Sequence, residues 1–112
     1  MTAHDLARRV VAAPHWRWMP GMRYTLPTTS LHGRWKPGLS QHIMPDLTDP
    51  ATLGCLLALV REAWGDPCIC TAVDNTSAGW WVDGWTAARP QVPSDLHPTE
   101  AAALVAALEA AP

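Results

Sequence analysis

Cysteine and histidine are the residues of this chain that could hold a metal ion. Cys68 and Cys70 are two positions apart, so on a β-strand both thiols would lie on the same face. Cys55 or one of the five histidines could complete a zinc site, because Cys and His are the usual zinc ligands. The spacing matches no known zinc finger, and reduced cysteines are common in the cores of cytoplasmic proteins. Cys68 and Cys70 are therefore weak metal candidates, and we expect no bound metal or cofactor.

Catalytic residues would have to come from carboxylates or from a Cys and His pair. Asp74 and Asp83 flank a predicted hairpin and could act as paired carboxylates in acid–base catalysis. The sequence favours another interpretation, in which Asp74 belongs to the turn and Asp83 faces water. The chain has neither a nucleophile elbow nor a glycine-rich phosphate loop. An enzyme would need His15, His32 or His42 to meet a Cys or a carboxylate in space, so we expect a protein without catalytic activity.

Tryptophans and basic residues are interleaved in the N-terminal part of the chain. The set comprises Trp16, Arg17, Trp18, Arg23, Arg34, Trp35 and Lys36. Indole rings stack on bases and cations contact phosphates, so single-stranded nucleic acid is one partner to consider. The net charge of −2 and the pI of about 6.2 disfavour it, because dedicated nucleic-acid binders are usually basic. The alternation of Trp16 and Trp18 also fits a strand with one face in the core, while Trp and Arg are common in protein-interface hot spots.

The net charge conceals a division along the chain. Residues 1–40 carry six basic residues against one acidic residue, a net charge of +5, and residues 41–112 carry two against nine, a net charge of −7. The two regions could form a basic face beside an acidic face that attracts a charged protein partner. The alternative is that they neutralise each other in the folded protein.

The helix in the middle of the chain has the clearest start and stop signals. Asp49 can serve as N-cap, and Pro50 suits the first helical position because it has no amide hydrogen to leave unpaired. Gly65 can take the left-handed cap conformation, and Pro67 prevents the helix from continuing. The residues between are apolar on nearly all sides, which predicts a helix that is either central or covered by a partner.

Two further helices are predicted at the ends of the chain. Thr2 and Asp5 resemble a capping box for a first helix of about ten residues that ends before Pro14. The segment from Thr99 to Glu109 is rich in Ala and Leu and has a packing stripe at Ala101, Leu104, Val105 and Leu108.

Strands are predicted between the helices. Short strands are expected at 23–26 and 41–44, and an antiparallel hairpin is expected from 68–73 and 80–87. In that hairpin Trp81 and Trp85 would share one face, and Trp80 would take the other. If helices cover only one face, at least one of these tryptophans is exposed, and an exposed Trp indicates an interaction site.

The predicted fold is one α/β domain over residues 1–112, an antiparallel sheet packed with three helices in the order α-β-β-α-β-β-α. The length suits a single core. No segment reaches the roughly 18 to 20 apolar residues of a membrane span. The N-terminus lacks the basic-then-apolar order of a signal peptide, so we expect a cytoplasmic protein.

The order of these segments resembles small phage and prophage proteins of the phage ABA sandwich domain group. The similarity rests on the Trp-rich segment after a short helix, on Pro45–Pro67, on the Trp-containing hairpin and on the Ala/Leu-rich ending at residues 99–110. It covers most of the chain except residues 20–40. The resemblance implies a phage-type α/β sandwich but no catalytic residue.

We therefore expect a non-enzymatic phage or prophage accessory protein that binds a macromolecular partner, such as an inhibitor of host defence. A protein partner is favoured over nucleic acid, and a homodimer is compatible with this interpretation. The alternative is a small-molecule or nucleotide-binding domain whose Trp-lined pocket lies between the sheet and residues 20–40, with Arg23 or Arg34 pointing inward. The candidate binding residues are Trp16, Arg17, Trp18, Arg23, Trp35, Trp81 and Trp85.

Overall fold

All three helices begin at the capping residues that the sequence provides. The structure is a computed structural model that describes residues 2–26, 29, 31–39, 42–74, 79–84 and 95–112. Helix α1 (Ala3–Val11) starts with the predicted capping box of Thr2 and Asp5. Helix α2 (Pro50–Trp64) is capped by Asp49 and ends at Gly65, which has a left-handed φ of 64°. Helix α3 (Glu100–Ala110) is capped by Thr99, whose hydroxyl accepts the Ala102 N–H at 3.1 Å.

The strands of the described chain form two antiparallel sheets. Strands β1 (Arg23–Thr25), β2 (His32–Arg34) and β3 (Met44–Pro45) form one sheet in the order β2-β1-β3. Strands β4 (Cys70–Val73) and β5 (Trp80–Asp83) form the predicted hairpin, in which Cys70 lies opposite Asp83. His97 extends this second sheet, because its backbone N–H and C=O each bond to Trp80 at 2.8 Å.

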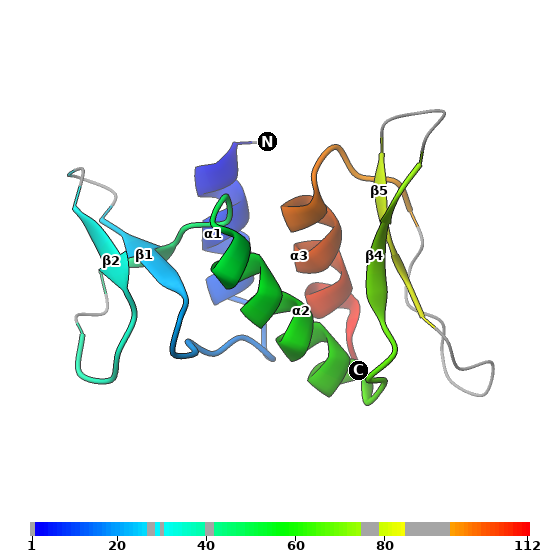
Figure 1. Cartoon of the computed structure of the whole chain (residues 1–112), viewed down its shortest axis with the longest axis horizontal. Helices are drawn as coiled ribbons and strands as arrows, with labels where there is room; N and C mark the ends of the chain where they lie inside the picture. The colour runs from blue at the N-terminus through cyan, green and yellow to red at the C-terminus, as the bar shows by residue number, and fades with distance from the viewer. Residues whose placement is uncertain (1, 27–28, 30, 40–41, 75–78, 85–94) are drawn as a thin grey trace.

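The helices form the middle layer of the molecule. Figure 1 shows the sheet of β1 and β2 on one side of them and the hairpin on the other. The predicted α+β class, the antiparallel pairing and the three helices are confirmed. The strands are divided between two sheets, whereas the sequence predicts one. They are divided because the helices separate β1, β2 and β3 from β4 and β5.

Helix α3 has the central place, which is one of the two alternatives that the sequence leaves open for α2. It packs against α1, α2 and both strands of the hairpin. Its alanines are buried along with its larger residues, so the burial extends well beyond the predicted stripe; the buried set is Ala101, Ala102, Ala103, Leu104, Val105, Ala107 and Leu108. On α2, by contrast, Gly54 and Ala58 are exposed. Small side chains let several elements approach α3 closely, which apolarity alone does not predict.

Several predicted strands are corrected in detail. The alternating segment at 15–19 is a loop, although Trp16 and Trp18 still pack against the core as a strand interpretation would require. The strand expected at 23–26 is confirmed as β1, and the one expected at 41–44 is shifted to Met44–Pro45. Strand β5 ends at Asp83, and residues 85–87 lie outside the described residues.

None of the helices in the described residues is both long enough and apolar enough to span a membrane.

Candidate functional site

The three N-terminal tryptophans form one aromatic cluster. Trp16 meets Trp18 edge-on, with ring centroids 5.5 Å apart, and Trp18 stacks on Trp35 at 6.3 Å with an interplanar angle of 12°. All three are half-buried and pack against the core. Because these rings pack against one another and against the core, their arrangement favours a structural role over stacking with bases.

The basic residues beside this cluster are held by carboxylates of the same chain. Arg17 donates two hydrogen bonds to Glu62, at 2.8 and 2.9 Å, and this lowers the pKa of the Glu62 carboxyl. Arg23 Nε lies 3.4 Å from Asp46 Oδ2. Arg17 is held by hydrogen bonds, and Arg23 is in an ion pair although its buried Nε makes no hydrogen bond in the described structure, which weakens the prediction that these two residues contact phosphates.

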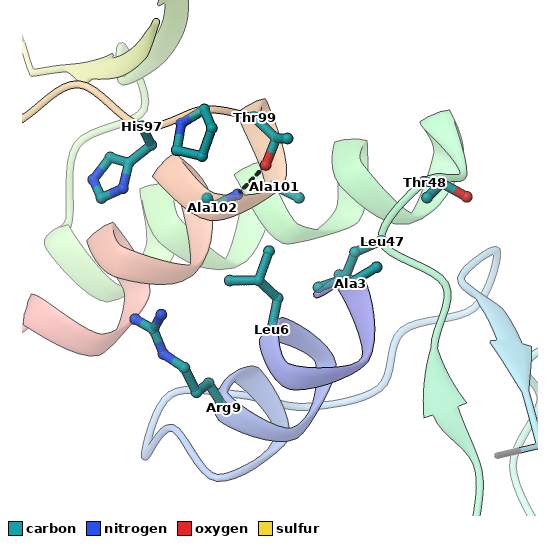
Figure 2. A pocket seen from close by; sticks show the side chains of 10 residues that line it. Ala3, Leu6, Arg9, Leu47, Thr48, His97, Thr99, Ala101 and Ala102 are labelled. Carbon is teal, nitrogen blue, oxygen red and sulfur yellow. Dashed lines mark hydrogen bonds between the residues drawn. The ribbon is translucent and has the colours of Figure 1, made fainter. Parts of the chain in front are cut away.

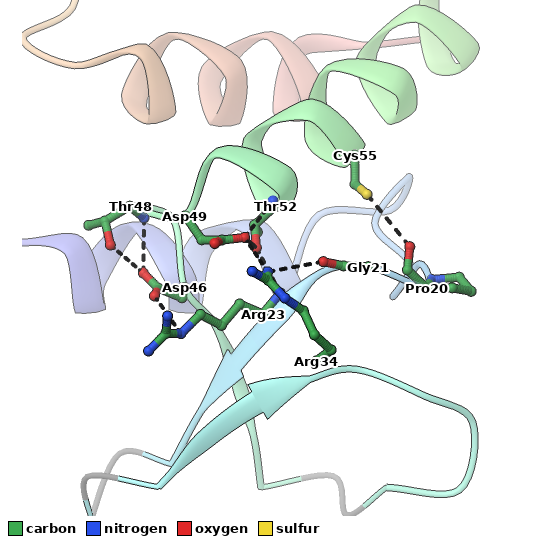
Figure 3. A network of polar contacts seen from close by, with 9 residues as sticks. All are labelled: Pro20, Gly21, Arg23, Arg34, Asp46, Thr48, Asp49, Thr52 and Cys55. Atoms are coloured by element: carbon green, nitrogen blue, oxygen red, sulfur yellow. Dashed lines mark hydrogen bonds and ion pairs between the residues drawn. The ribbon is translucent and has the colours of Figure 1, made fainter.

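Arg34 is also held by a carboxylate, within a larger network of polar contacts. Figure 3 shows its guanidinium beside Asp49, with Nη1 2.6 Å from Asp49 Oδ2 and 3.2 Å from the Gly21 carbonyl. The same Asp49 oxygen accepts the backbone N–H of Thr52 at 3.0 Å and its hydroxyl at 2.9 Å. The Arg34 hydrogen bond is the main cause that lowers the pKa of Asp49 to about 2. The network joins β2 to the start of α2 and is structural.

Four ion pairs therefore connect the basic N-terminal region to the acidic remainder of the chain. They are Arg9–Glu109, Arg17–Glu62, Arg23–Asp46 and Arg34–Asp49. Mutual neutralisation of the two regions is confirmed for these pairs. In the part of the chain that the structure describes, the exposed Asp83 and Asp95 take no part in these four pairs.

The outward side of the hairpin combines apolar and acidic residues. Trp80 and Val82 face the helices, because Val82 is buried and Trp80 packs against the core. Trp81 and Asp83 therefore point outward, together with Cys70, which lies opposite Asp83. Gly79 shares that face, and the Leu96 Cβ lies 3.0 Å from where a Gly79 Cβ would stand. Asp83, Cys70 and Leu96 are exposed, Leu96 to 49%.

We call this surface the hairpin face; it consists of Cys70, Trp81, Asp83 and Leu96, and the exposed Asp95 precedes Leu96 in the chain. The sequence predicts the opposite orientations of Trp80 and Trp81 correctly. It also predicts an exposed Trp, but both side chains are half-buried and Leu96 is the exposed apolar residue here. Trp85 lies outside the described residues. The sequence does not point to Leu96, because this residue lies in the Pro-rich connector before the last helix and has no alternating pattern of neighbours that would indicate a strand.

The thiols do not form a metal site within the described residues. Cys68 and Cys70 are both exposed, and Cys68 lies before β4 in the turn that Asp66 stabilises. Cys55 is on α2, where its thiol is directed at the Pro20 carbonyl, 3.9 Å away (Figure 3). Among the described His, Cys, Asp and Glu residues no group of three could hold a metal ion.

A cavity of about 300 Å³ lies between α1, α3 and the segment before α2. Leu6 points into it from α1, and Ala101 and Ala102 line it from α3 (Figure 2). Its remaining lining residues are Ala3, Arg9, Leu47, Thr48, His97, Pro98 and Thr99. It contains no tryptophan, Arg23 or Arg34, so it is not the Trp-lined pocket that the sequence suggested. The sequence gives no sign of it, because three distant segments contribute to its wall.

Comparison with protein-family models, with curated proteins and with solved structures finds no match to this chain.

Proposed function

We propose that this chain is a non-enzymatic binding protein whose hairpin face docks on a basic surface of a protein partner. The observation that carries the proposal is the distribution of charge after folding. Four arginines are paired with carboxylates around the helices and the first sheet. Asp83 at the end of β5 and Asp95 just before His97 are exposed, and the described residues after Arg61 include neither lysine nor arginine.

The chemistry of the hairpin face suits a protein better than a small anion or a nucleic acid. Asp83 and Asp95 are exposed and would repel phosphates, whereas they attract a basic surface and direct its approach. Leu96 and the partly accessible ring of Trp81 supply apolar contact area between them. Apolar contacts with a charged rim are the usual anatomy of a specific protein interface.

The resemblance to phage and prophage proteins supplies a biological setting for this proposal. In that setting the chain is an accessory protein that inhibits a host defence component. Nucleases guided by RNA hold their nucleic acids in positively charged channels, and an acidic surface with apolar anchors is complementary to such a channel. A homodimer formed through the hairpin face is the competing use of the same surface.

Affinity purification from a bacterial host tests the proposal. A tagged wild-type chain is compared with the Asp83→Lys and Leu96→Asp variants, each checked for folding by circular dichroism. We expect one host protein recovered in stoichiometric amount by the wild type and lost with both variants. The matched control is Lys36→Glu, which reverses an exposed charge just after β2 on the far side of the helices.

Two results would overturn this proposal. One is recovery of a stoichiometric protein that both hairpin-face variants retain, which would move the partner site elsewhere. The other is a wild-type chain that captures no partner protein and carries only nucleic acid or a second copy of itself.

A small-molecule function has a separate observation in its favour, the cavity beside α3. The nucleotide version of that alternative has little support, because the lining of the described cavity includes neither a Trp nor a Tyr to stack on a base.

A further inference from the structure

We infer that the cavity between α1 and α3 is a binding site for a small aliphatic molecule that carries one hydrogen-bond-accepting group, such as a medium-chain carboxylic acid. The inference is independent of the hairpin face. It rests on the shape of the cavity and on the chemistry of its two ends. A volume of about 300 Å³ is at the lower end of the range of small-molecule sites.

The middle part of the cavity is apolar, and elements that are themselves held in place form its wall. Leu6, Ala101 and Ala102 are buried residues on helices whose first turns are capped by side chains. Leu47 is also buried, on the segment that leads into α2. These side chains offer no hydrogen bond, so they favour a hydrocarbon chain.

One end of the cavity carries donors. Figure 2 shows the His97 ring and the Thr99 side chain at the start of α3. The Thr99 oxygen accepts the Ala102 N–H, which leaves its own O–H as a donor. Within the described part of the chain, the His97 ring has no hydrogen-bond partner. Arg9 also lines the cavity, from α1, but its guanidinium is bound to Glu109.

These donors are held in place before any ligand arrives. The His97 backbone is fixed to Trp80 by two hydrogen bonds of 2.8 Å, and Pro98 restricts the backbone of His97, the residue before it. Thr99 is fixed as the N-cap of α3. A site that is already ordered loses little entropy on binding, and two donors at one end specify an acceptor group there. The geometry therefore favours an acid with its carboxylate at His97 and Thr99 and its chain toward Leu47.

The test is a titration of the isotope-labelled protein with butanoate, hexanoate and octanoate, followed by NMR. We expect shifts at Leu6, His97 and Ala102, and a dissociation constant that falls about fourfold for each added CH₂ group, the value for burying a methylene. Octan-1-ol, which has the same chain length but a hydroxyl in place of the carboxylate, distinguishes contacts to the chain from contacts to the carboxylate. It should bind at the same residues, and His97→Ala should weaken octanoate more than it weakens the alcohol.

Filling the cavity provides the control. Ala102→Leu places a larger side chain inside it and should reduce octanoate binding at least tenfold. Ala3→Leu does so from an exposed position in the first turn of α1, where an effect on folding is not expected. Ala110→Leu, exposed on the same helix as Ala102, should leave binding unchanged. Binding that does not depend on chain length would overturn the inference, and so would binding that survives Ala3→Leu. The absence of any chemical-shift change at ligand concentrations up to about 10 mM, ten times the dissociation constant of about 1 mM expected for such small ligands, would overturn it as well.

Discussion

At the residue scale, Asp49 illustrates how one carboxylate can serve two elements. It caps α2 through Thr52 and receives the guanidinium of Arg34 from β2. The side chain is only 8% exposed, so its negative charge depends on these partners. The sequence identified Asp49 as a cap from its position before Pro50. It could not identify Arg34 as the partner, because that contact depends on the path of the chain between them.

The low pKa of Asp49 predicts a loss of stability in acid. A carboxyl whose pKa is about 2 in the folded protein and 3.8 in its ordinary state stabilises the fold above about pH 4, and this contribution is lost as the pH falls toward 2. Asp49→Asn keeps a capping side chain but removes the charge. We expect it to lower the free energy of unfolding at pH 7 by about 1 to 2 kcal/mol, less than the full pKa shift implies because the Arg34 side chain is half exposed.

Urea unfolding at pH 7, 4, 3 and 2 checks this prediction. The difference between wild type and Asp49→Asn should shrink through the interval from pH 4 to 2. Asp83→Asn, at an exposed position, should behave like the wild type. A constant difference across this interval would mean that the charge of Asp49 does not stabilise the fold.

The tryptophan cluster gives a second prediction at this scale. Trp18 touches both of its neighbours, so Trp18→Ala removes one edge contact and one stacked contact as well as apolar burial. Aromatic pairs contribute about 0.5 to 1.5 kcal/mol each beyond burial, and we expect a loss of about 2 to 4 kcal/mol in urea unfolding. A variant as stable as the wild type would instead favour a binding role for these rings.

At the element scale, α3 is the helix around which the others pack. Its last turn is also fixed by a side chain of α2, because Trp64 Nε1 donates to the Ala107 carbonyl at 2.8 Å. Both α2 and α3 are apolar on most sides, so the sequence does not rank them. Which of the two helices is more buried depends on which of them has alanines where neighbouring elements approach it most closely.

The difference in burial between α2 and α3 can be tested with matched substitutions. Ala103→Leu adds three carbons at a site on α3 that is 2% exposed, and we expect about 1 to 3 kcal/mol of destabilisation from overpacking. Ala58→Leu makes the same change on the exposed side of α2 and should change stability by less than about 0.5 kcal/mol. Thermal and urea unfolding of the two variants provide the comparison, and equal effects would contradict a central α3.

Element bounds were predicted more successfully than the way the elements assemble. Thr2, Asp49, Gly65 and Thr99 set helix ends through local hydrogen bonds, and these signals are written in neighbouring residues. The hairpin was predicted for a similar reason, since its strands are close in sequence. Strand β2 was not predicted, because His32–Arg34 has no alternating pattern and is stabilised by pairing with β1.

At the scale of the whole molecule, folding separates the charges in a way that composition does not reveal. The sequence divides into basic and acidic regions, and the structure pairs four arginines across that division. Among the described residues, Asp83 and Asp95 stay exposed outside these four pairs. Of the predicted binding residues, Trp16, Arg17, Trp18, Arg23 and Trp35 are used in packing or ion pairs, and Trp81 belongs to the hairpin face.

The most direct test of the proposed partner site is the affinity of the purified chain for the protein it captures, measured by calorimetry at several salt concentrations. We expect the affinity to fall as salt rises, and we expect Asp83→Lys together with Asp95→Lys to weaken binding at least tenfold, because like charges are brought together. Lys36→Glu should leave it unchanged. An affinity that depends neither on salt nor on the two aspartates would contradict docking through the hairpin face.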